Sequence, residues 1–207
     1  MSRFFFPATR GSKETDFRNM KKTLLILFTL FGLTRVQAQF ISDEAIEVSV
    51  GYGLSVPYDE VGFYGTGYFA QGEYVLGINE WVDLRPYAGY IFTEMNESFG
   101  GPIKPEDKAT VNAFLFGGKA RLTLPTEWVA PYLELGVGST VGTFETVTAK
   151  RKFEKSGIFL HFPVSVGFEL GPDHNVTLEL TGFLHNSPAQ VTGAVAIGLS
   201  FPVGYYR

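Results

Sequence analysis

The sequence predicts an all-β fold, an eight-stranded antiparallel up-and-down transmembrane β-barrel. Bulky apolar residues alternate with small or polar ones in eight segments between residues 44 and 203. A period of two places successive side chains on opposite faces of a strand. No stretch beyond the first 38 residues has the roughly 18 consecutive apolar residues that a membrane-spanning helix needs. Alternating strands of this kind cross a membrane only as a closed barrel.

The first four strands are expected over residues 44–56, 66–77, 81–95 and 109–124. One face of each strand carries bulky apolar side chains, among them Ile46, Val48, Val50, Tyr68, Tyr74, Leu84, Tyr90, Phe114 and Phe116. The opposite face carries small and charged residues, among them Glu47, Gln71, Glu73, Asp83, Arg85, Lys119 and Arg121. Each segment is long enough, at about ten residues or more, to cross the hydrocarbon layer when tilted.

The last four strands are expected over residues 128–144, 157–170, 175–185 and 190–203. Their apolar faces include Leu133, Leu135, Val137, Ile158, Leu160, Phe162, Leu178, Leu180, Val195 and Ile197. Their other faces include Glu134, Thr140, Phe159, His161, Ser165, Glu169, Glu179, Ala194 and Ala196. The same two-faced pattern therefore runs through all eight segments.

The predicted connections alternate in length. Short turns rich in Gly, Pro, Asn and Asp follow the second, fourth and sixth strands, at 77–80, 125–127 and 171–175. Longer loops, at 57–65, 96–108 and 145–156, follow the first, third and fifth strands. Short turns on one rim and long loops on the other are typical of membrane barrels. Trp81, Trp128, Tyr205 and Tyr206 are expected near the short-turn rim, where an aromatic belt is usual.

Residues 1–38 are predicted to be a leader, with the barrel in residues 39–207. Met20 and two lysines precede the short apolar core 23–33, and Val36-Gln37-Ala38 has the small-x-small pattern of a cleavage site. We therefore expect Met20 to be the functional start. Seven of the 17 Lys/Arg and two of the 21 Asp/Glu lie in this leader, which leaves ten bases and 19 acids after it, a net charge of −9. This charge argues against nucleic-acid binding.

The candidate site residues are charged groups expected in the lumen. An isolated buried ion is costly, so these groups should pair with one another. We expect a structural ion-pair network that fills the lumen, because eight strands leave an interior about wide enough for side chains alone. At most a narrow ion channel would pass through it. The residues are Glu47, Glu73, Asp83, Arg85, Lys119, Arg121, Glu134, Glu169 and Glu179.

The alternation over 44–203 resembles the small eight-stranded outer-membrane barrels of the OmpA/OmpX type. Segment 84–90 (LRPYAGY) is similar to a strand motif of porin-like barrels, and Gly198, Phe201 and Val203 resemble the terminal signal that the barrel-insertion machinery recognises. The resemblance implies a Gram-negative outer membrane, periplasmic termini, and lipid around the barrel. It also implies a non-enzymatic structural or surface-interaction protein, with any extracellular partner held by the long loops.

Two alternatives remain open. His185-Asn186-Ser187 resembles the H-x-S element of outer-membrane lipid A 3-O-deacylases, which implies Ser187 as nucleophile and His185 as base. Residues 188–207 hold no Asp or Glu for the expected third member, so we predict that the protein is not an enzyme. The second alternative is a soluble periplasmic ligand-binding barrel, but the bulky face here is continuous and the other face is charged, the reverse of such barrels.

No cofactor and no metal site are predicted. The three histidines, His161, His174 and His185, do not follow a metal-ligand spacing, and there is no cysteine. We expect His161 to be a hydrogen-bonded lumen residue and His174 to lie in a turn. Four acids in or beside the second long loop offer weak calcium ligands, although a solvated loop is the preferred interpretation: Glu94, Glu97, Glu106 and Asp107.

Overall fold

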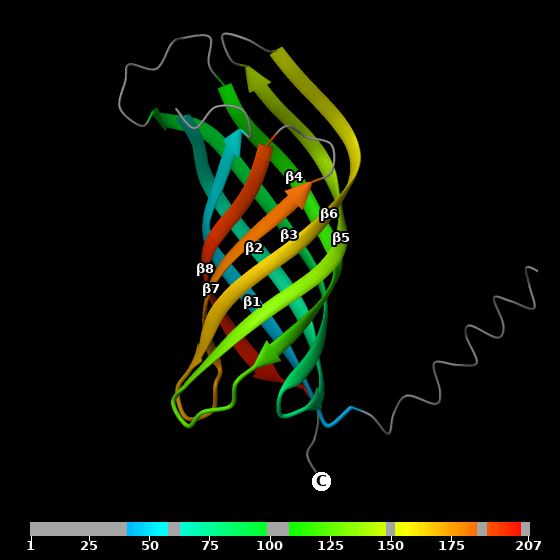
Figure 1. The fold of residues 1–207 in the computed structure, drawn as a ribbon, viewed down its shortest axis with the longest axis vertical. Coiled ribbons are helices and arrows are strands. Elements are labelled where there is room, and N and C mark those ends of the chain that lie inside the picture. The colour runs from blue at the N-terminus through cyan, green and yellow to red at the C-terminus, as the bar shows by residue number, and fades with distance from the viewer. Residues whose placement is uncertain (1–40, 58–62, 99–107, 148–151, 186–189, 204–207) are drawn as a thin grey trace, which may run out of the picture. The chain divides into compact units, whose positions relative to one another are not determined.

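Eight β-strands make up almost all of the chain that the computed structural model describes, which is residues 41–57, 63–98, 108–147, 152–185 and 190–203 (Figure 1). The strands are β1 (Asp43–Pro57), β2 (Phe63–Asn79), β3 (Val82–Ser98), β4 (Lys108–Thr123), β5 (Val129–Val147), β6 (Lys152–Leu170), β7 (Val176–His185) and β8 (Gln190–Pro202). No helix of the described residues is long and apolar enough to span a membrane. The leader predicted over 1–38 lies outside the described residues.

Each strand pairs antiparallel with its neighbours in sequence, and β8 pairs with β1 to close a barrel. Closure gives every strand two neighbouring strands, so most backbone donors and acceptors of the barrel are paired and no strand is an open edge along its whole length. Ala45 lies opposite Pro202, so β1 begins and β8 ends at the same rim. The predicted fold class, an eight-stranded up-and-down barrel, is confirmed.

Three short connections lie at the rim where β1 begins, and we call this end the turn rim. They are residues 80–81, 124–128 and 171–175. Gly171 has a φ of 92°, a conformation that L side chains rarely adopt, and it begins the turn between β6 and β7. His174 lies in the same turn, as predicted. The opposite end is called the loop rim.

Several strands reach further toward the loop rim than the sequence predicted. The loops expected over 57–65, 96–108 and 145–156 are wrong at their edges, because residues 63–65, 96–98, 145–147 and 152–156 belong to strands. β5 and β6 are the longest strands, at 19 residues each. The backbone pairing continues through these segments, although their sequences lack the regular apolar alternation of the strand centres.

The two faces of the barrel differ as predicted. The outward side chains of β1 illustrate the exterior, since Val48, Val50 and Tyr52 are about half exposed or more. The inward neighbours Glu47, Ser49 and Ser55 are buried. A soluble protein places its apolar residues inside and its charges outside, so this barrel is inverted and its exterior matches a hydrocarbon environment.

Candidate functional site

All nine charged residues predicted for the lumen lie inside the barrel, in its half near the turn rim. We call this group the charged layer. Seven strands contribute to it, so residues far apart in sequence meet across the lumen. Its members are Glu47, Glu73, Asp83, Arg85, Lys119, Arg121, Glu134, Glu169 and Glu179.

Arg121 is at the centre of the charged layer. Its side chain is fully buried, and its Nε lies 2.7 Å from Glu134 Oε1 while its Nη1 lies 2.8 Å from Glu169 Oε1. The guanidinium carbon also lies 3.7 Å from the centre of the Tyr132 ring. Arginine suits this position because its planar group donates in several directions and stacks on aromatic rings. Removing it would leave several carboxylates without a counter-ion.

Arg85 links the carboxylates of neighbouring strands. Glu47 and Glu73 lie directly opposite each other on β1 and β2, an arrangement of like charges that is unfavourable by itself. Arg85 Nη1 lies 2.7 Å from Glu47 Oε2 and 3.4 Å from Glu73 Oε2, and its Nη2 lies 3.0 Å from Asp83 Oδ2. Glu47 also accepts a hydrogen bond of 2.9 Å from Thr177 on β7. These contacts connect both sides of the seam where β8 meets β1.

Lys119 occupies the one place among the described residues where three carboxylates come close enough to hold a metal ion. These are Glu73, Glu134 and Glu179. Lys119 Nζ lies 2.6 Å from Glu73, 2.6 Å from Glu134 and 3.9 Å from Glu179. The ammonium group therefore supplies positive charge where a cation would otherwise sit.

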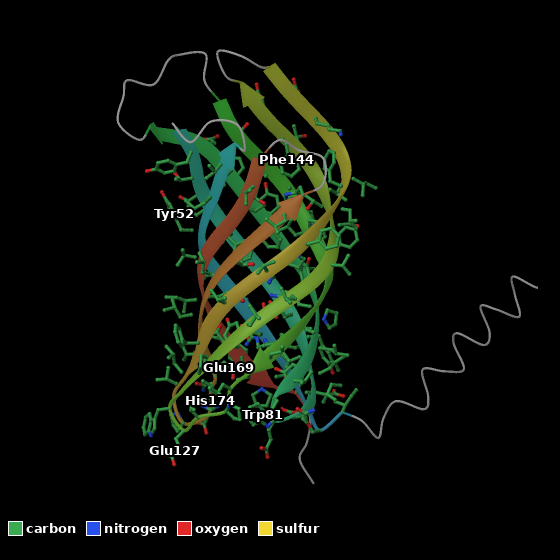
Figure 2. All side chains as sticks on the ribbon, in the orientation of Figure 1. Tyr52, Trp81, Glu127, Phe144, Glu169 and His174 are labelled. Atoms are coloured by element: carbon green, nitrogen blue, oxygen red, sulfur yellow. The ribbon has the colours of Figure 1, made fainter. Side chains whose placement is uncertain are left out.

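The half of the lumen near the loop rim is apolar, which the sequence analysis did not predict. We call it the aromatic layer. Phe144 is completely buried, and Figure 2 places it near the loop rim, whereas Glu169 of the charged layer lies nearer the turn rim. The layer consists of Phe69, Tyr87, Ile91, Val111, Leu115, Phe144, Phe159 and Phe183. Its inward Phe and Ile residues alternate with outward residues just as the charged residues do. The only sequence signal for this layer is therefore the large size of these residues on a face that is otherwise small or charged.

A chain of polar groups crosses the aromatic layer. Tyr87 and His161 are hydrogen-bonded through the phenol oxygen and Nε2. Thr140 Oγ1 lies 2.6 Å from His161 Nδ1 and 2.9 Å from His185 Nε2. One hydroxyl can donate to one ring and accept from the other, so Thr140 supplies a partner for one nitrogen of each imidazole. His161 is thus a hydrogen-bonded lumen residue, as predicted.

Gly138 provides a test of this packing. A Cβ there would lie 2.6 Å from His161 Nε2 and 2.6 Å from the carbonyl oxygen of Phe116, whereas a Cβ at the outward Gly118 would meet nothing within 4 Å. We expect Gly138→Val to lower the free energy of unfolding by about 1–3 kcal/mol through overpacking, and Gly118→Val to leave it nearly unchanged. Urea titrations of both variants in lipid vesicles measure this difference. Equal effects would contradict the packing described.

A cavity of about 760 Å³ lies inside the turn rim. Asp83, Arg85 and Glu169 of the charged layer line it, together with Asp43 and His174. Figure 2 shows Glu169, His174 and Trp81 at this end. Trp81 and Trp128 are more than half exposed, in the turns of this rim, as predicted; Tyr205 and Tyr206 lie outside the described residues.

The remaining candidates fall partly outside the described chain. Glu94 belongs to β3, beside the expected loop; Glu97 also belongs to β3 and not to the loop, while Glu106 and Asp107 lie outside the described residues. Ser187 also lies outside the described residues, so the pairing of Ser187 with His185 stays a prediction. The His185 ring is nearly buried and packs edge-on against Phe144, with ring centres 5.0 Å apart.

No protein-family model and no curated protein matches the chain. Among solved structures, Neisserial surface protein A aligns with a TM-score of 0.54 at 11% identity, over 77% of this chain and 97% of its own. The attachment invasion locus protein Ail of Yersinia pestis aligns at 14% identity with a TM-score of 0.46, over 77% of this chain and 99% of its own. The outer membrane enzyme PagL aligns at 12% identity with a TM-score of 0.44, over 77% of this chain and 99% of its own.

At 11% identity, the similarity to Neisserial surface protein A is evidence about the fold alone. The barrel closure, the strand order and the inverted faces agree with it. The chain therefore has the fold of the small eight-stranded outer-membrane β-barrels.

Proposed function

We propose that the protein is an integral barrel of the Gram-negative outer membrane with a closed lumen and a structural or surface-interaction role. The apolar exterior supports the membrane location. The observation that carries the closed lumen is its filling by two successive layers of buried side chains. Arg121 and Glu134 in one layer and Phe144 and Phe183 in the other are at most 1% exposed.

The charged layer acts in this proposal as a structural network. Each of its three cations contacts at least two carboxylates within 4 Å. Its carboxylates outnumber its cations, so the layer would attract small cations if the lumen opened. We expect the periplasm to face the turn rim, where both ends of the barrel meet, and the external medium to face the loop rim. The barrel-insertion machinery would recognise β8, and any external partner would meet the loop rim.

A planar-bilayer recording tests the closed lumen. We expect the refolded protein to insert without discrete conductance steps. The double variant Phe144→Ala and Phe183→Ala removes two fully buried rings from the aromatic layer and is expected to produce small cation-selective steps. As a matched control, Phe114→Ala and Phe116→Ala removes two rings from the exterior, where both are more than 40% exposed, and should stay silent. Steps in the unmodified protein would overturn the closed-lumen proposal.

The lipid-hydrolase alternative receives no support from the described residues. A general base must reach the proton that it removes, and His185 instead directs Nε2 to Thr140 inside the lumen. We expect Ser187→Ala to leave the lipid A composition of the host membrane unchanged. A loss of 3-O-deacylation in that variant would restore the alternative.

A further inference from the structure

The two buried histidines of the lumen lie side by side. His161 on β6 and His185 on β7 are directly opposite each other in the register, and their ring centres are 5.6 Å apart. Both rings direct one nitrogen to the hydroxyl of Thr140 on β5, at 2.6 and 2.9 Å. His161 is fully buried and His185 is 6% exposed. We call His161 and His185 the histidine pair, because the fold holds these two ionisable rings together in the interior of the barrel.

The histidine pair is part of the packing that closes the lumen. The His161 ring lies edge-on to Phe183, with ring centres 5.3 Å apart, and the His185 ring lies edge-on to Phe144 at 5.0 Å. These two phenylalanines are the rings whose burial supports a closed lumen, since each is at most 1% exposed. A displacement of either imidazole therefore loosens the aromatic layer directly.

Around the aromatic layer, the other titratable groups are a phenol and two lysines. Tyr87 of β3 is hydrogen-bonded to His161, and Lys119 Nζ of β4 lies 5.5 Å from the centre of the Tyr87 ring. Closer to the loop rim, Lys155 Nζ of β6 lies 5.3 Å from the centre of the Phe159 ring in the same layer. Neither a phenol nor an ammonium group supplies a negative charge that could balance a proton on the histidine pair.

The carboxylates of the charged layer are engaged with other cations. They come from β1, β2, β3, β5, β6 and β7, and each contacts Arg85, Lys119 or Arg121. The strands β4 and β8 contain no Asp or Glu. Among the described contacts, neither histidine forms an ion pair or a hydrogen bond with a carboxylate. The histidine pair therefore lacks a counter-ion in the part of the lumen that the structure describes.

Protonation changes what these two rings require. While both imidazoles are neutral, the Thr140 hydroxyl can donate to one ring and accept from the other. When both are protonated, every ring nitrogen is a donor, and two positive charges face each other among aromatic rings without the counter-ion that a buried charge needs. Histidine is the side chain that gains a proton as the pH falls just below neutrality. The doubly charged pair therefore favours a loosened layer in which water solvates the rings.

We propose that protonation of the histidine pair opens the lumen at acid pH. The charged imidazoles separate and become hydrated, which admits water into the aromatic layer and joins the charged layer to the loop rim. The charged layer has six carboxylates and three cations, so small cations find ligands there, and the aromatic layer is the barrier that protonation removes. The inference rests on the proposed function, because only a lumen that is closed at neutral pH can be opened by acid. The silence expected above is that of the neutral pair.

Planar-bilayer recordings of the refolded full chain at about pH 7.5 and about pH 5 test this switch, since histidine changes charge between these values. We expect no steps at the higher pH and discrete conductance steps at the lower pH, which disappear when neutral buffer is restored. The double variant His161→Gln with His185→Gln cannot take up these protons and should lose the difference between the two pH values. His174→Gln is the matched control, because His174 lies in the turn after β6, and it should keep the acid-induced steps.

Single variants cover the case in which the double variant does not fold, which heat-modifiable migration in gels reveals. His161→Gln and His185→Gln each leave one proton coupled to opening instead of two, so the steps should rise less steeply as the pH falls. Silence of the unmodified protein at the lower pH would overturn the inference. An unchanged acid response in the folded glutamine variants would overturn it as well, because titration of the carboxylates would then explain the opening. Steps in the unmodified protein at the higher pH contradict the closed lumen itself.

Discussion

Replacement of Arg121 by leucine is expected to lower the free energy of unfolding by about 3–5 kcal/mol, because it leaves buried carboxylates without a counter-ion. Glu134 and Glu169 would each lose their shortest contact with Arg121, at 2.7 and 2.8 Å. The stacking of the guanidinium on Tyr132 would disappear as well. Urea titration of the protein in lipid vesicles, followed by tryptophan fluorescence, measures the loss.

Glu179→Gln is the matched control within the same layer. Its nearest cationic atoms, Lys119 Nζ and Arg121 Nη2, are both 3.9 Å away, and its Oε1 has no hydrogen-bond partner among the described residues. The neutral amide should therefore cost much less than the loss of Arg121. Equal losses of unfolding free energy in Arg121→Leu and Glu179→Gln would contradict the central role of Arg121 in the charged layer.

Leu135→Arg is expected to destabilise the membrane-inserted protein by about 2–4 kcal/mol. The reason is the high free energy of a charged side chain in hydrocarbon, at the middle of the lipid-facing band. Leu135 is 52% exposed and lies at the middle of the outward apolar residues of β5, which run from Val129 to Val141. In a water-soluble barrel the same substitution would place an arginine at an exposed site, where little would change. The unfolding free energy in vesicles therefore distinguishes lipid from water at this position.

Val129→Arg offers the internal comparison on the same strand. Val129 is 49% exposed, nearly the same as Leu135, but it begins β5 at the turn rim. Near the interface the cost falls to about 0–1 kcal/mol because the side chain reaches water. Equal effects at both positions would contradict the membrane orientation of the barrel.

The faces of the strands were predictable because the alternation persists wherever one side meets lipid. β1 shows this from Ile46 to Val56, and seven of the nine charged residues expected in the lumen are buried inside the barrel. Their partners were not predictable, because register joins residues that are remote in sequence. The contact of Thr177 with Glu47 spans 130 positions, for example.

The aromatic layer and the strand ends show what alternation cannot reveal. Phe159 was assigned to the inner face of β6, yet periodicity does not say whether inner residues form a polar or an apolar layer. Phe69 and Phe183 come from distant strands and meet only in the folded barrel, with ring centres 6.1 Å apart. The sequence predicts a loop over 145–156, where Glu, Lys and Thr do not alternate regularly with apolar residues, yet the outer ends of β5 and β6 lie in this range.

The central claim is that the outward faces of the strands lie against lipid, and a cysteine scan along β5 tests it most directly. The chain has no cysteine, so each single cysteine introduced between residues 132 and 141 would be the only site that a spin label can modify. Spin labels at outward positions such as Leu133, Leu135 and Val137 should collide with oxygen dissolved in lipid and not with a water-soluble nickel complex, with a period of two along the strand. Free access of the nickel complex to those outward positions would contradict the membrane barrel.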